Sequence, residues 1–354
     1  MKIFLAGGGT LGPVTPLFAL VEAWRKQDVS VSFELVGTPT GPERLLAGKY
    51  AVMFASLPVT RLRRSVSLEW LLLPFRFFQA LVQSAHLLHA GKPDVIIGAG
   101  GFTQVPLIWM GRLFGIPSFV LQTDVLPLLS NRLVACCVRQ IFLGWKQTSA
   151  YFPSNKISYI GVPVRASLHG GDADRAIERF HLQKQKPTVF VFGGGTGSLW
   201  LNKQMTEIVS QLTQEMNVIH ITGTGKKLEP LSTQDDGYVV VEQMEDGLED
   251  VYALADIVVA RAGLGTISEL AALKKPAILI PLPGSAQEEN ARVLEQAHAA
   301  RVLVQNQTNA EQLLQEIRLL VKTHDLQQVL AQNIQTVIKT DVADELIASI
   351  HQQC

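Results

Sequence analysis

The stretch ADIVVARAGLGTISELAALKKPAILIPLP, residues 255–283, decides the fold of this chain. Two short apolar runs in it, Ile257–Ala260 and Ala277–Ile280, are typical of strands that are buried on both faces. Between them, two glycines lead into a segment with apolar side chains at helical spacing, which predicts a helix over Thr266–Lys274. Strand, glycine-rich turn, helix and strand form a βαβ unit, and such units build parallel sheets.

The turn at the start of this helix is also a candidate anion site. Unpaired N–H groups and the positive end of the helix dipole attract negative charge, and a diphosphate is the anion we expect there. Glu269, one turn into the helix, could accept hydrogen bonds from the paired hydroxyls of a ribose. In the alternative interpretation, Gly263 and Gly265 only permit close helix–sheet packing, and Glu269 only completes a capping box with Thr266 as N-cap. The local sequence leaves both interpretations open.

Composition bounds the class of protein. A chain of 354 residues is too long for one core and fits two domains. Apolar residues make up 47% of it and the formal net charge is zero, which is typical of a globular protein with no overall attraction to nucleic acid. The three cysteines form neither a disulfide framework nor a metal-ligand pattern, and suit a reducing cytoplasm. The N-terminal apolar run is too short for a signal peptide, and no run approaches the roughly 20 residues that span a bilayer, so we expect a soluble or peripheral protein.

The pattern of strand, glycine-rich turn and helix restarts halfway along the chain. Strands are predicted at residues 3–6, 31–36, 51–57, 94–98, 118–121, 140–143 and 157–160, and then at 188–192, 217–222, 238–241, 257–260 and 277–280. Each half opens with a strand followed by Gly-Gly-Gly-Thr, at 7–10 and at 193–196. We therefore predict an α/β protein with two Rossmann-like, doubly wound parallel-sheet domains, 1–162 and 163–340. A helical pattern over 326–351 runs into a C-terminal helical tail, 341–354.

Four glycine-rich turns follow predicted strands, at 7–12, 98–101, 193–197 and 263–265. None has the lysine of a Walker motif, and neither domain opens with a clean GxGxxG, which weakens ATPase and dinucleotide-binding interpretations. The concentration of glycines at strand ends nevertheless favours a ligand site there.

Few other residues suggest chemistry. Asp172-Ala173-Asp174 could be a metal-binding D-x-D, but it follows glycines and precedes a helical pattern, which favours N-capping. We find no His, Cys or carboxylate cluster with metal-ligand spacing, and predict neither a metal nor a cofactor. Arg165 and Arg261 are candidate phosphate partners because guanidinium matches phosphate oxygens bidentately, although Arg165 could equally be a surface residue.

Residues 59–90 depart from the strand–helix pattern. Arginines at 61, 63, 64 and 76 interleave with large apolar side chains, and the candidate membrane patch consists of Trp70, Leu71, Leu72, Phe75, Phe77 and Phe78. Large apolar residues beside arginines are what a helix or loop in a membrane interface requires. We favour a membrane contact, with packing in the protein core as the alternative.

Motifs along nearly the whole chain resemble, in order, those of the MurG family of glycosyltransferases. The family's GGTGGH-type loop corresponds to GGTLGP at 8–13, its GGY-type turn to 100–102, its GNPVR segment to GVPVR at 161–165, and its GGSQGA loop to GGGTGS at 193–198. The strongest match is the RSGA-T-SE signature, here RAGLGTISE at 261–269, and a Q-x-x-N-A motif follows at 287–291.

The resemblance implies a GT-B fold and an inverting, metal-independent transfer of N-acetylglucosamine. The implied donor is UDP-N-acetylglucosamine, and the implied acceptor is polyprenyl-diphosphate-linked N-acetylmuramyl-pentapeptide, used in peptidoglycan synthesis at the cytoplasmic face of the cell membrane by a peripheral protein. By analogy, Glu269 would hold the ribose hydroxyls and the 264–268 turn the diphosphate, while Gln287 would meet the sugar. Glu245 and Leu248 would flank the uracil, and Arg165 would meet phosphate. The complete donor site that we predict is Thr10, Leu11, Gly12, Asp124, Arg165, Gly195, Thr196, Glu245, Leu248, Arg261, Leu264, Gly265, Thr266, Ile267, Ser268, Glu269 and Gln287.

This chain departs from the family pattern at several positions. The family's histidine after the first glycine loop is Pro13 here, and proline can neither titrate nor donate. The HEQN-type segment reads Leu-Gln-Thr-Asp at 121–124, and Gly195 and Thr196 stand where the donor loop usually has Ser and Gln. Inverting transfer needs a base for the incoming hydroxyl, and we assign that role to Asp124, which follows a predicted strand. The resemblance therefore supports the donor half better than the acceptor half.

Three other functions remain open on the sequence. A related transferase could use another lipid or glycan acceptor. A UDP-sugar 2-epimerase would share the two-domain fold and UDP site, and would need no lipid. A sugar-nucleotide-binding protein without a catalytic base would bind UDP and turn nothing over.

Overall fold

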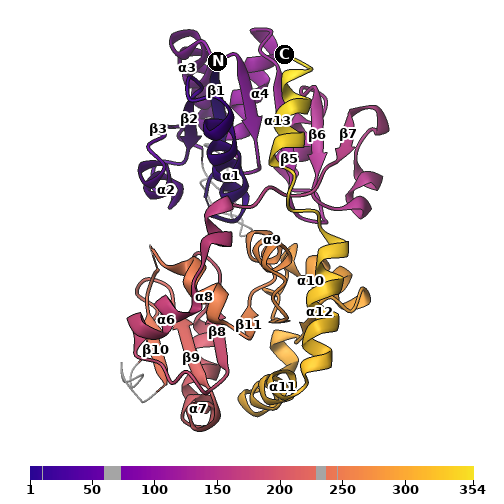
Figure 1. Cartoon of the computed structure of the whole chain (residues 1–354). Helices are drawn as coiled ribbons and strands as arrows, with labels where there is room; N and C mark the ends of the chain where they lie inside the picture. Colours follow the sequence, from indigo (N-terminus) through magenta and orange to yellow (C-terminus); the bar gives the residue numbers. More distant parts are fainter. Residues whose placement is uncertain (10, 60–72, 229–236, 245) are drawn as a thin grey trace. The chain divides into compact units, whose positions relative to one another are not determined.

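The computed structural model describes residues 1–9, 11–59, 73–228, 237–244 and 246–354 (Figure 1). The chain divides into two compact units. The first consists of Met1–Arg165 together with Asp341–Cys354, and the second of Ala166–Thr340. Trp70, Leu71 and Leu72 of the candidate membrane patch lie outside the described residues, as do Thr10 and Glu245 of the candidate donor site.

In the described part of the first unit, seven parallel strands form one sheet in the order β3-β2-β1-β4-β5-β6-β7. The strands are β1 (Lys2–Ala6), β2 (Ser32–Gly37), β3 (Met53–Ser56), β4 (Val95–Gly98), β5 (Ser118–Gln122), β6 (Gln140–Leu143) and β7 (Ile157–Tyr159). The α-helices are α1 (Leu11–Gln27), α2 (Glu43–Lys49), α3 (Leu73–Gly91), α4 (Gln104–Leu113), α5 (Leu129–Val134) and α13 (Ala343–His351).

In the described part of the second unit, six parallel strands form a sheet in the order β10-β9-β8-β11-β12-β13. The strands are β8 (Thr188–Phe192), β9 (Asn217–Ile221), β10 (Tyr238–Val241), β11 (Ile257–Ala260), β12 (Ala277–Leu279) and β13 (Arg301–Val302). The α-helices are α6 (Ala173–Phe180), α7 (Leu199–Glu215), α8 (Leu248–Leu254), α9 (Leu264–Leu273), α10 (Gln287–Gln296), α11 (Ala310–Lys322) and α12 (His324–Val337). The short 3₁₀ segment η5 (Gln305–Gln307) lies between β13 and α11.

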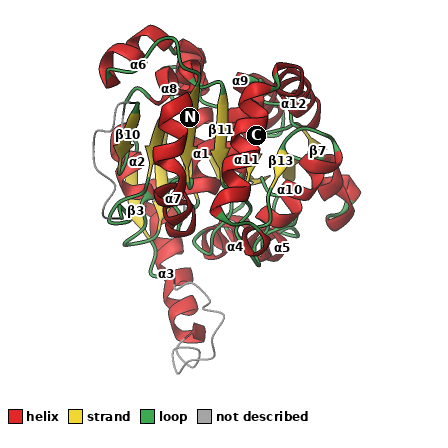
Figure 2. Ribbon diagram, turned by 90° about the horizontal axis from the view of Figure 1, so that it is seen from below, coloured by secondary structure: helices red, strands yellow, loops and turns green. Residues whose placement is uncertain are grey.

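The two sheets repeat one topology, and helices lie on both sides of their strands (Figure 2). In each, the first strand of the unit sits inside the sheet, and the winding direction reverses on its far side, between β1 and β4 and between β8 and β11. This is the doubly wound arrangement predicted from the alternation of apolar runs and helices. In such sheets ligands bind at the carboxyl ends of the strands where the winding reverses. We therefore expect ligand sites at these two points.

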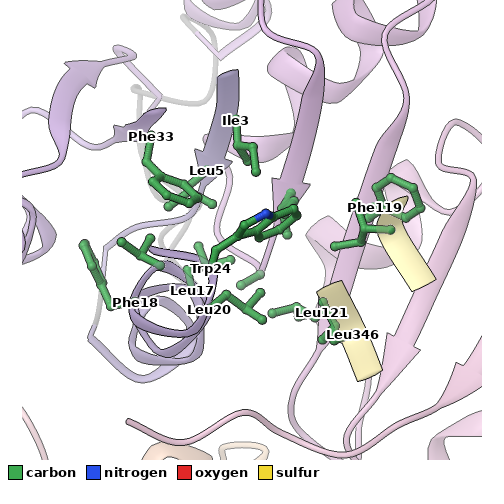
Figure 3. Close-up of a cluster of buried hydrophobic side chains, with 14 of the residues drawn as sticks. Ile3, Leu5, Leu17, Phe18, Leu20, Trp24, Phe33, Phe119, Leu121 and Leu346 are labelled. Carbon is green, nitrogen blue, oxygen red and sulfur yellow. The ribbon is translucent and has the colours of Figure 1, made fainter. Parts of the chain in front are cut away.

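The core of the first unit includes residues from the end of the chain. Trp24 of α1 is fully buried among Ile3, Leu20 and other apolar side chains, and Leu346 of α13 lies in the same cluster (Figure 3). The ring of His351 meets the Trp24 ring edge-on at 5.3 Å between centroids. The C-terminal helix thus covers α1, and burying its apolar face stabilises the first unit.

The structure corrects some of the predicted elements. The helix expected over Thr266–Lys274 begins at Leu264, and its N-cap is Gly263 in an extended conformation. Thr266 is therefore inside the first turn and is not an N-cap, so the capping box with Glu269 is wrong. The continuous helical pattern over 326–351 is divided into α12 and α13, because residues 338–342 leave the helix as the chain crosses between units. The two-residue strand β13 was not predicted.

Candidate functional site

Two glycine-containing turns meet where the winding of the second sheet reverses. The turn 193–198 follows β8, the turn 261–263 follows β11, and these strands pair up to Phe192 and Ala260. A hydrogen bond of 2.8 Å from the Arg261 guanidinium to Ser198 Oγ joins the two turns directly. Both turns end at helix N-termini, since Ser198 caps α7 and Gly263 caps α9. Unpaired N–H groups of both helices are available at this edge of the sheet for an anion.

The turn 193–198 is tightly held at its base and open at its tip. Gly197 has a φ of 70°, and a Cβ there would lie 2.1 Å from the carbonyl oxygen of Thr222, so only glycine fits. Lys226 Nζ donates to the carbonyl oxygens of Thr196 (2.7 Å) and Gly197 (3.1 Å). Gly195 and Thr196, both predicted donor-site residues, are exposed at the tip. A lysine thus places positive charge beside a turn whose tip is open to a ligand.

A hydrogen-bonded network of three buried side chains supports the segment that carries Lys226. Asn202 of α7 donates to the carbonyl oxygens of Thr222 (3.0 Å) and Lys226 (2.9 Å), and its Oδ1 lies 3.1 Å from His220 Nε2. His220 Nδ1 lies 2.8 Å from the Tyr238 hydroxyl. Burial lowers the pKa of His220 to about 4, so the imidazole is neutral at physiological pH. The sequence singled out none of these three side chains as a structural network.

In the first turn of α9, backbone groups are better placed than side chains to bind an anion. The side chains of Leu264, Thr266, Ile267 and Ser268 are buried, and Ser268 Oγ donates to the Gly265 carbonyl at 2.9 Å. Of the predicted diphosphate turn 264–268, the groups suited to an anion are therefore the N–H groups of the first turn, which no helical carbonyl can satisfy. Gly265 leaves that backbone open, since it adds no side chain.

Glu269 and Gln287 lie near this turn. Glu269 is only 8% exposed, and its Oε2 accepts a 2.9 Å hydrogen bond from the hydroxyl of Tyr252 on α8. Gln287 begins α10, its Oε1 accepts from the Leu282 N–H at 2.9 Å, and its Nε2 lies 3.6 Å from where a Cβ on Gly263 would be. The structure therefore places Gln287 beside the N-cap of α9 and Glu269 farther along the same helix.

Arg261 has a different environment from the one we expected. It is 6% exposed, and besides Ser198 its terminal nitrogens donate to the carbonyl oxygens of Ile280 (3.0 Å) and Pro281 (3.3 Å) and to Gln305 Oε1 (2.6 Å). Burial lowers its pKa, and its guanidinium lies 5.8 Å from the centre of the Trp200 ring. These bonds tie β11, the end of β12, α7 and η5 together, so a phosphate contact would require Arg261 to give one of them up.

Two other predicted donor residues, Leu248 and Arg165, precede Arg261 in the chain. Leu248 is the half-buried first residue of α8, directly after Gly247 in the left-handed conformation. Arg165 is the last residue of the first unit, and its guanidinium lies near the hydroxyl of Tyr50.

Two glycine turns also pack together where the winding of the first sheet reverses. A Cβ on Gly101, whose φ is 87°, would lie 2.8 Å from the carbonyl oxygen of Gly8, so the turn after β4 packs backbone against backbone on the turn after β1. Leu11, Gly12 and Pro13 follow as the first turn of α1, and Gly12 is exposed with open space around it.

Glu43 of α2 anchors the first of these turns. Its carboxylate is fully buried and accepts from the Gly9 N–H (3.1 Å), the Thr38 N–H (2.7 Å) and the Thr38 hydroxyl (2.5 Å). Three donors satisfy the charge that burial would otherwise penalise. No sequence pattern indicates this role, because Glu43 lies 34 positions from Gly9.

Asp124, the predicted base, lies in a segment that side chains hold from both sides. Buried Gln122 donates to the Asp124 carbonyl at 2.7 Å and accepts from Asn131 at 2.7 Å. Asn131 in turn accepts from Gln104, whose Oε1 accepts from the Gly100 N–H at 3.0 Å. This chain of amides links the second glycine turn to the Asp124 backbone, and the Asp124 side chain is half-buried.

The described part of the candidate membrane patch is divided between surface and interior. Phe75 and Phe78 on α3 are 69% and 64% exposed, but Phe77 turns inward and meets the Trp109 ring edge-on at 5.5 Å. Phe114, just after α4, is also exposed and lines an apolar groove of about 480 Å³ together with Phe78 and other residues of α3 and α4. The patch predicted from the sequence lacks the contribution of α4, because the groove residue Met110 and the following Phe114 lie outside the 59–90 segment.

The D-x-D segment at 172–174 begins a helix. Asp172 is the N-cap of α6 and accepts from the N–H groups of Asp174 and Arg175, as predicted in preference to a metal site. No group of three His, Cys, Asp or Glu side chains in that part of the chain is arranged to hold a metal ion, and the three cysteines are free thiols. None of the helices described here combines the length and apolar character needed to cross a bilayer.

Comparison with known proteins places this arrangement in a family. Residues 3–143 match the N-terminal domain of glycosyltransferase family 28, and residues 188–346 match its C-terminal domain. The chain is 32% identical over 323 residues to the UDP-N-acetylglucosamine–N-acetylmuramyl-(pentapeptide) pyrophosphoryl-undecaprenol N-acetylglucosamine transferase of Lachnospira eligens, with 90% of each chain covered. It is 33% identical over 332 residues to the protein of the same name from Geobacillus kaustophilus, with 92% of each covered.

Solved structures agree on the fold. MurG from Acinetobacter baumannii has a TM-score of 0.74 at 20% identity and covers 99% of both chains. UDP-GlcNAc 2-epimerase from Neisseria meningitidis bound to UDP-GlcNAc has a TM-score of 0.72 at 12% identity and covers 99% of this chain and 100% of its own. The two doubly wound domains thus have the GT-B fold, as predicted, and the matches along both show that this chain belongs to glycosyltransferase family 28.

Proposed function

We propose that this chain transfers N-acetylglucosamine, with inversion, from UDP-N-acetylglucosamine to polyprenyl-diphosphate-linked N-acetylmuramyl-pentapeptide, in peptidoglycan synthesis. The observation that supports this most directly is the pair of helix N-termini, α7 and α9, that meet at one reversal point with the buried Glu269 beside them. The name of the relatives, which share about a third of their residues with this chain over nine-tenths of its length, supports the donor and the acceptor.

The donor half would act on the leaving group. Backbone N–H groups at the start of α9 and at the 193–198 turn would hold the diphosphate, Glu269 the ribose hydroxyls, Leu248 and Glu245 the uracil, and Gln287 the sugar. As the bond between the sugar and the diphosphate breaks, negative charge grows on the departing UDP, and fixed N–H groups and helix dipoles stabilise it without reorganising. Lys226, on the carbonyls of the same turn, adds positive charge there.

The acceptor half would supply alignment and the base. We propose that Asp124 takes the proton of the incoming hydroxyl, since Pro13 cannot, and that the amide chain through Gln122 and Asn131 holds its backbone in place. Replacing Asp124 by Asn should lower kcat by 10²–10⁴-fold and leave UDP affinity unchanged. A kcat within threefold of wild type would mean that another group is the base.

The exposed side chains of α3 and α4 would meet the cytoplasmic face of the cell membrane, where the lipid-linked acceptor resides. Phe75 and Phe78 would insert at the interface, and the α3–α4 groove would enlarge the apolar contact. Flotation with vesicles containing anionic lipid tests this proposal with Phe75→Ser/Phe78→Ser and, as a matched control on a different exposed apolar residue, Leu319→Ser of α11. Only the double variant should lose vesicle binding.

The experiment that tests the function is transfer of labelled N-acetylglucosamine from UDP-N-acetylglucosamine to a lipid I analogue, with and without EDTA. We expect transfer that EDTA does not inhibit. A second candidate is a UDP-sugar 2-epimerase, since an enzyme of that name shares this fold. It predicts conversion of free UDP-N-acetylglucosamine in the absence of lipid. UDP binding with neither reaction would point to another acceptor or to a binding protein.

A further inference from the structure

The hydrogen bond between Tyr252 and Glu269 has a consequence for how a nucleotide is recognised. Glu269 is a carboxylate at 8% exposure, and a buried carboxylate needs donors to offset the loss of water. The Tyr252 hydroxyl donates to one of its two oxygens, Oε2, at 2.9 Å. That bond fixes the rotation of the carboxylate group about its last side-chain torsion, which is otherwise broad.

Tyr252 is itself held by packing against β8. Its side chain is fully buried, and its ring meets the rings of Phe190 and Phe192 on β8 edge-on, at 5.3 and 6.2 Å between centroids and nearly perpendicular. Aromatic pairs in this geometry are attractive beyond their buried area. The hydroxyl therefore stays where the sheet places it, and the Glu269 carboxylate is oriented by β8 through Tyr252.

Two vicinal hydroxyls of a ribose can both donate to one carboxylate only when its plane faces them. Because Oε2 is directed by Tyr252, the orientation of the pair of oxygens is set before any ligand arrives. We propose that Tyr252 is a positioning residue for ribose recognition: it preorganises Glu269 to accept the paired hydroxyls of the nucleotide. This inference rests on the proposed function, in which Glu269 binds the ribose of the donor.

The test compares UDP with 2′,3′-dideoxy-UDP, which lacks both hydroxyls, by calorimetric titration of the full chain. Tyr252→Phe removes only the hydroxyl and keeps the ring in its aromatic contacts. We expect it to weaken UDP binding about tenfold, because hydrogen bonds to a charged group are involved, and to leave dideoxy-UDP binding within about twofold of wild type. In a Glu269→Gln background, Tyr252→Phe should change UDP binding by less than about twofold, since both changes act on one interaction.

Tyr238→Phe is the matched control. It removes the hydroxyl of another buried tyrosine in the same unit, whose partner is His220 and not Glu269. If Tyr238→Phe loosens the unit generally, it should lower the affinities for UDP and dideoxy-UDP by the same factor. The ratio of the two affinities should therefore stay as in the wild type.

Two results would overturn the inference. One is that Tyr252→Phe lowers the affinities for UDP and dideoxy-UDP equally, which would mean that the tyrosine only supports the fold. The other is that Tyr252→Phe leaves the affinity for UDP unchanged. If Glu269→Gln lowers the preference for UDP over dideoxy-UDP in either case, the donor-site assignment still holds. If Glu269→Gln leaves that preference intact, the assignment of Glu269 to the ribose fails together with the inference.

Discussion

Replacing Arg261 by Met tests whether this residue binds a phosphate, as its sequence position suggests, or holds the neighbouring turns together, as its contacts indicate. The variant keeps a long side chain and removes the guanidinium. In the wild type this group donates to Ser198 Oγ, to Gln305 Oε1 and to the carbonyl oxygens of Ile280 and Pro281 at 2.6–3.3 Å, in a site where only 6% of the residue is exposed. All four acceptors would lose a donor at once.

The magnitude follows from this geometry. Hydrogen bonds from charged donors contribute roughly 1.5–3 kcal/mol each, but the guanidinium also loses hydration on burial, which is why its pKa is lowered. A buried acceptor left without a donor costs about 1–3 kcal/mol, and removing the desolvated charge offsets part of the sum over four acceptors, so we expect Arg261→Met to destabilise the second unit by about 3–5 kcal/mol. Arg261→Lys should recover little, because an ammonium cannot present donors in the planar fork that four acceptors require.

Hydrogen exchange with mass spectrometry reports each unit separately, which a single unfolding curve of a two-domain chain would not. Peptides covering β8 and β11 should lose protection in Arg261→Met, and peptides covering β1 and β4 of the first unit should not. UDP binding should then weaken more than uridine binding, because the loosened turns are the ones proposed to hold the diphosphate. Wild-type protection together with a loss confined to UDP would refute this reasoning and make Arg261 a direct phosphate partner.

Three further predictions concern two buried carboxylates, Glu269 and Glu43, and one buried imidazole, His220. Glu269→Ala should weaken UDP binding by about one to two orders of magnitude, because the ribose hydroxyls lose a charged acceptor; wild-type affinity in a calorimetric titration would remove Glu269 from the site. Glu43→Ala should destabilise the first unit by roughly 3 kcal/mol or more, since two backbone N–H groups and a hydroxyl lose their acceptor, and unchanged exchange protection of β1 and β2 would contradict this. Burial lowers the pKa of His220 to about 4, below the unfolded value of about 6.5, so the folded state binds fewer protons between these limits. Its contribution to stability is therefore present above pH 6.5 and falls by about 1.4 kcal/mol per unit as the pH drops toward 4; His220→Gln should remove that part of the slope in urea titrations, and an identical slope would contradict the assignment.

Much of the fold follows from local sequence. Apolar runs such as Ile257–Ala260 predicted central parallel strands with the observed bounds, because a strand buried on both faces needs apolar side chains in succession. Asp172 predicted a helix start, because an N-cap satisfies N–H groups only two and three residues away. The repeated Gly-Gly-Gly-Thr predicted two similar domains, and the two sheets have one strand order.

Other features depend on which elements the fold brings together. The start of α9 at Leu264 was mispredicted from local capping signals, whereas the observed turn is held by Arg261 bonded to a residue 63 positions away. Glu43 and Gly9 are 34 positions apart, and Tyr252 and Glu269 are 17 apart on different helices.

Sequence by itself determined most of the strands, the N-cap at Asp172 and the glycine turns of this protein, because each of these is decided by neighbours within a few residues. Tertiary structure alone decided that the C-terminal helix α13 covers α1 in the first unit, and which buried polar groups meet. The physical reason is that a buried charge or hydroxyl is tolerated only with a partner, and that partner is supplied by the packing of distant elements rather than by adjacent residues.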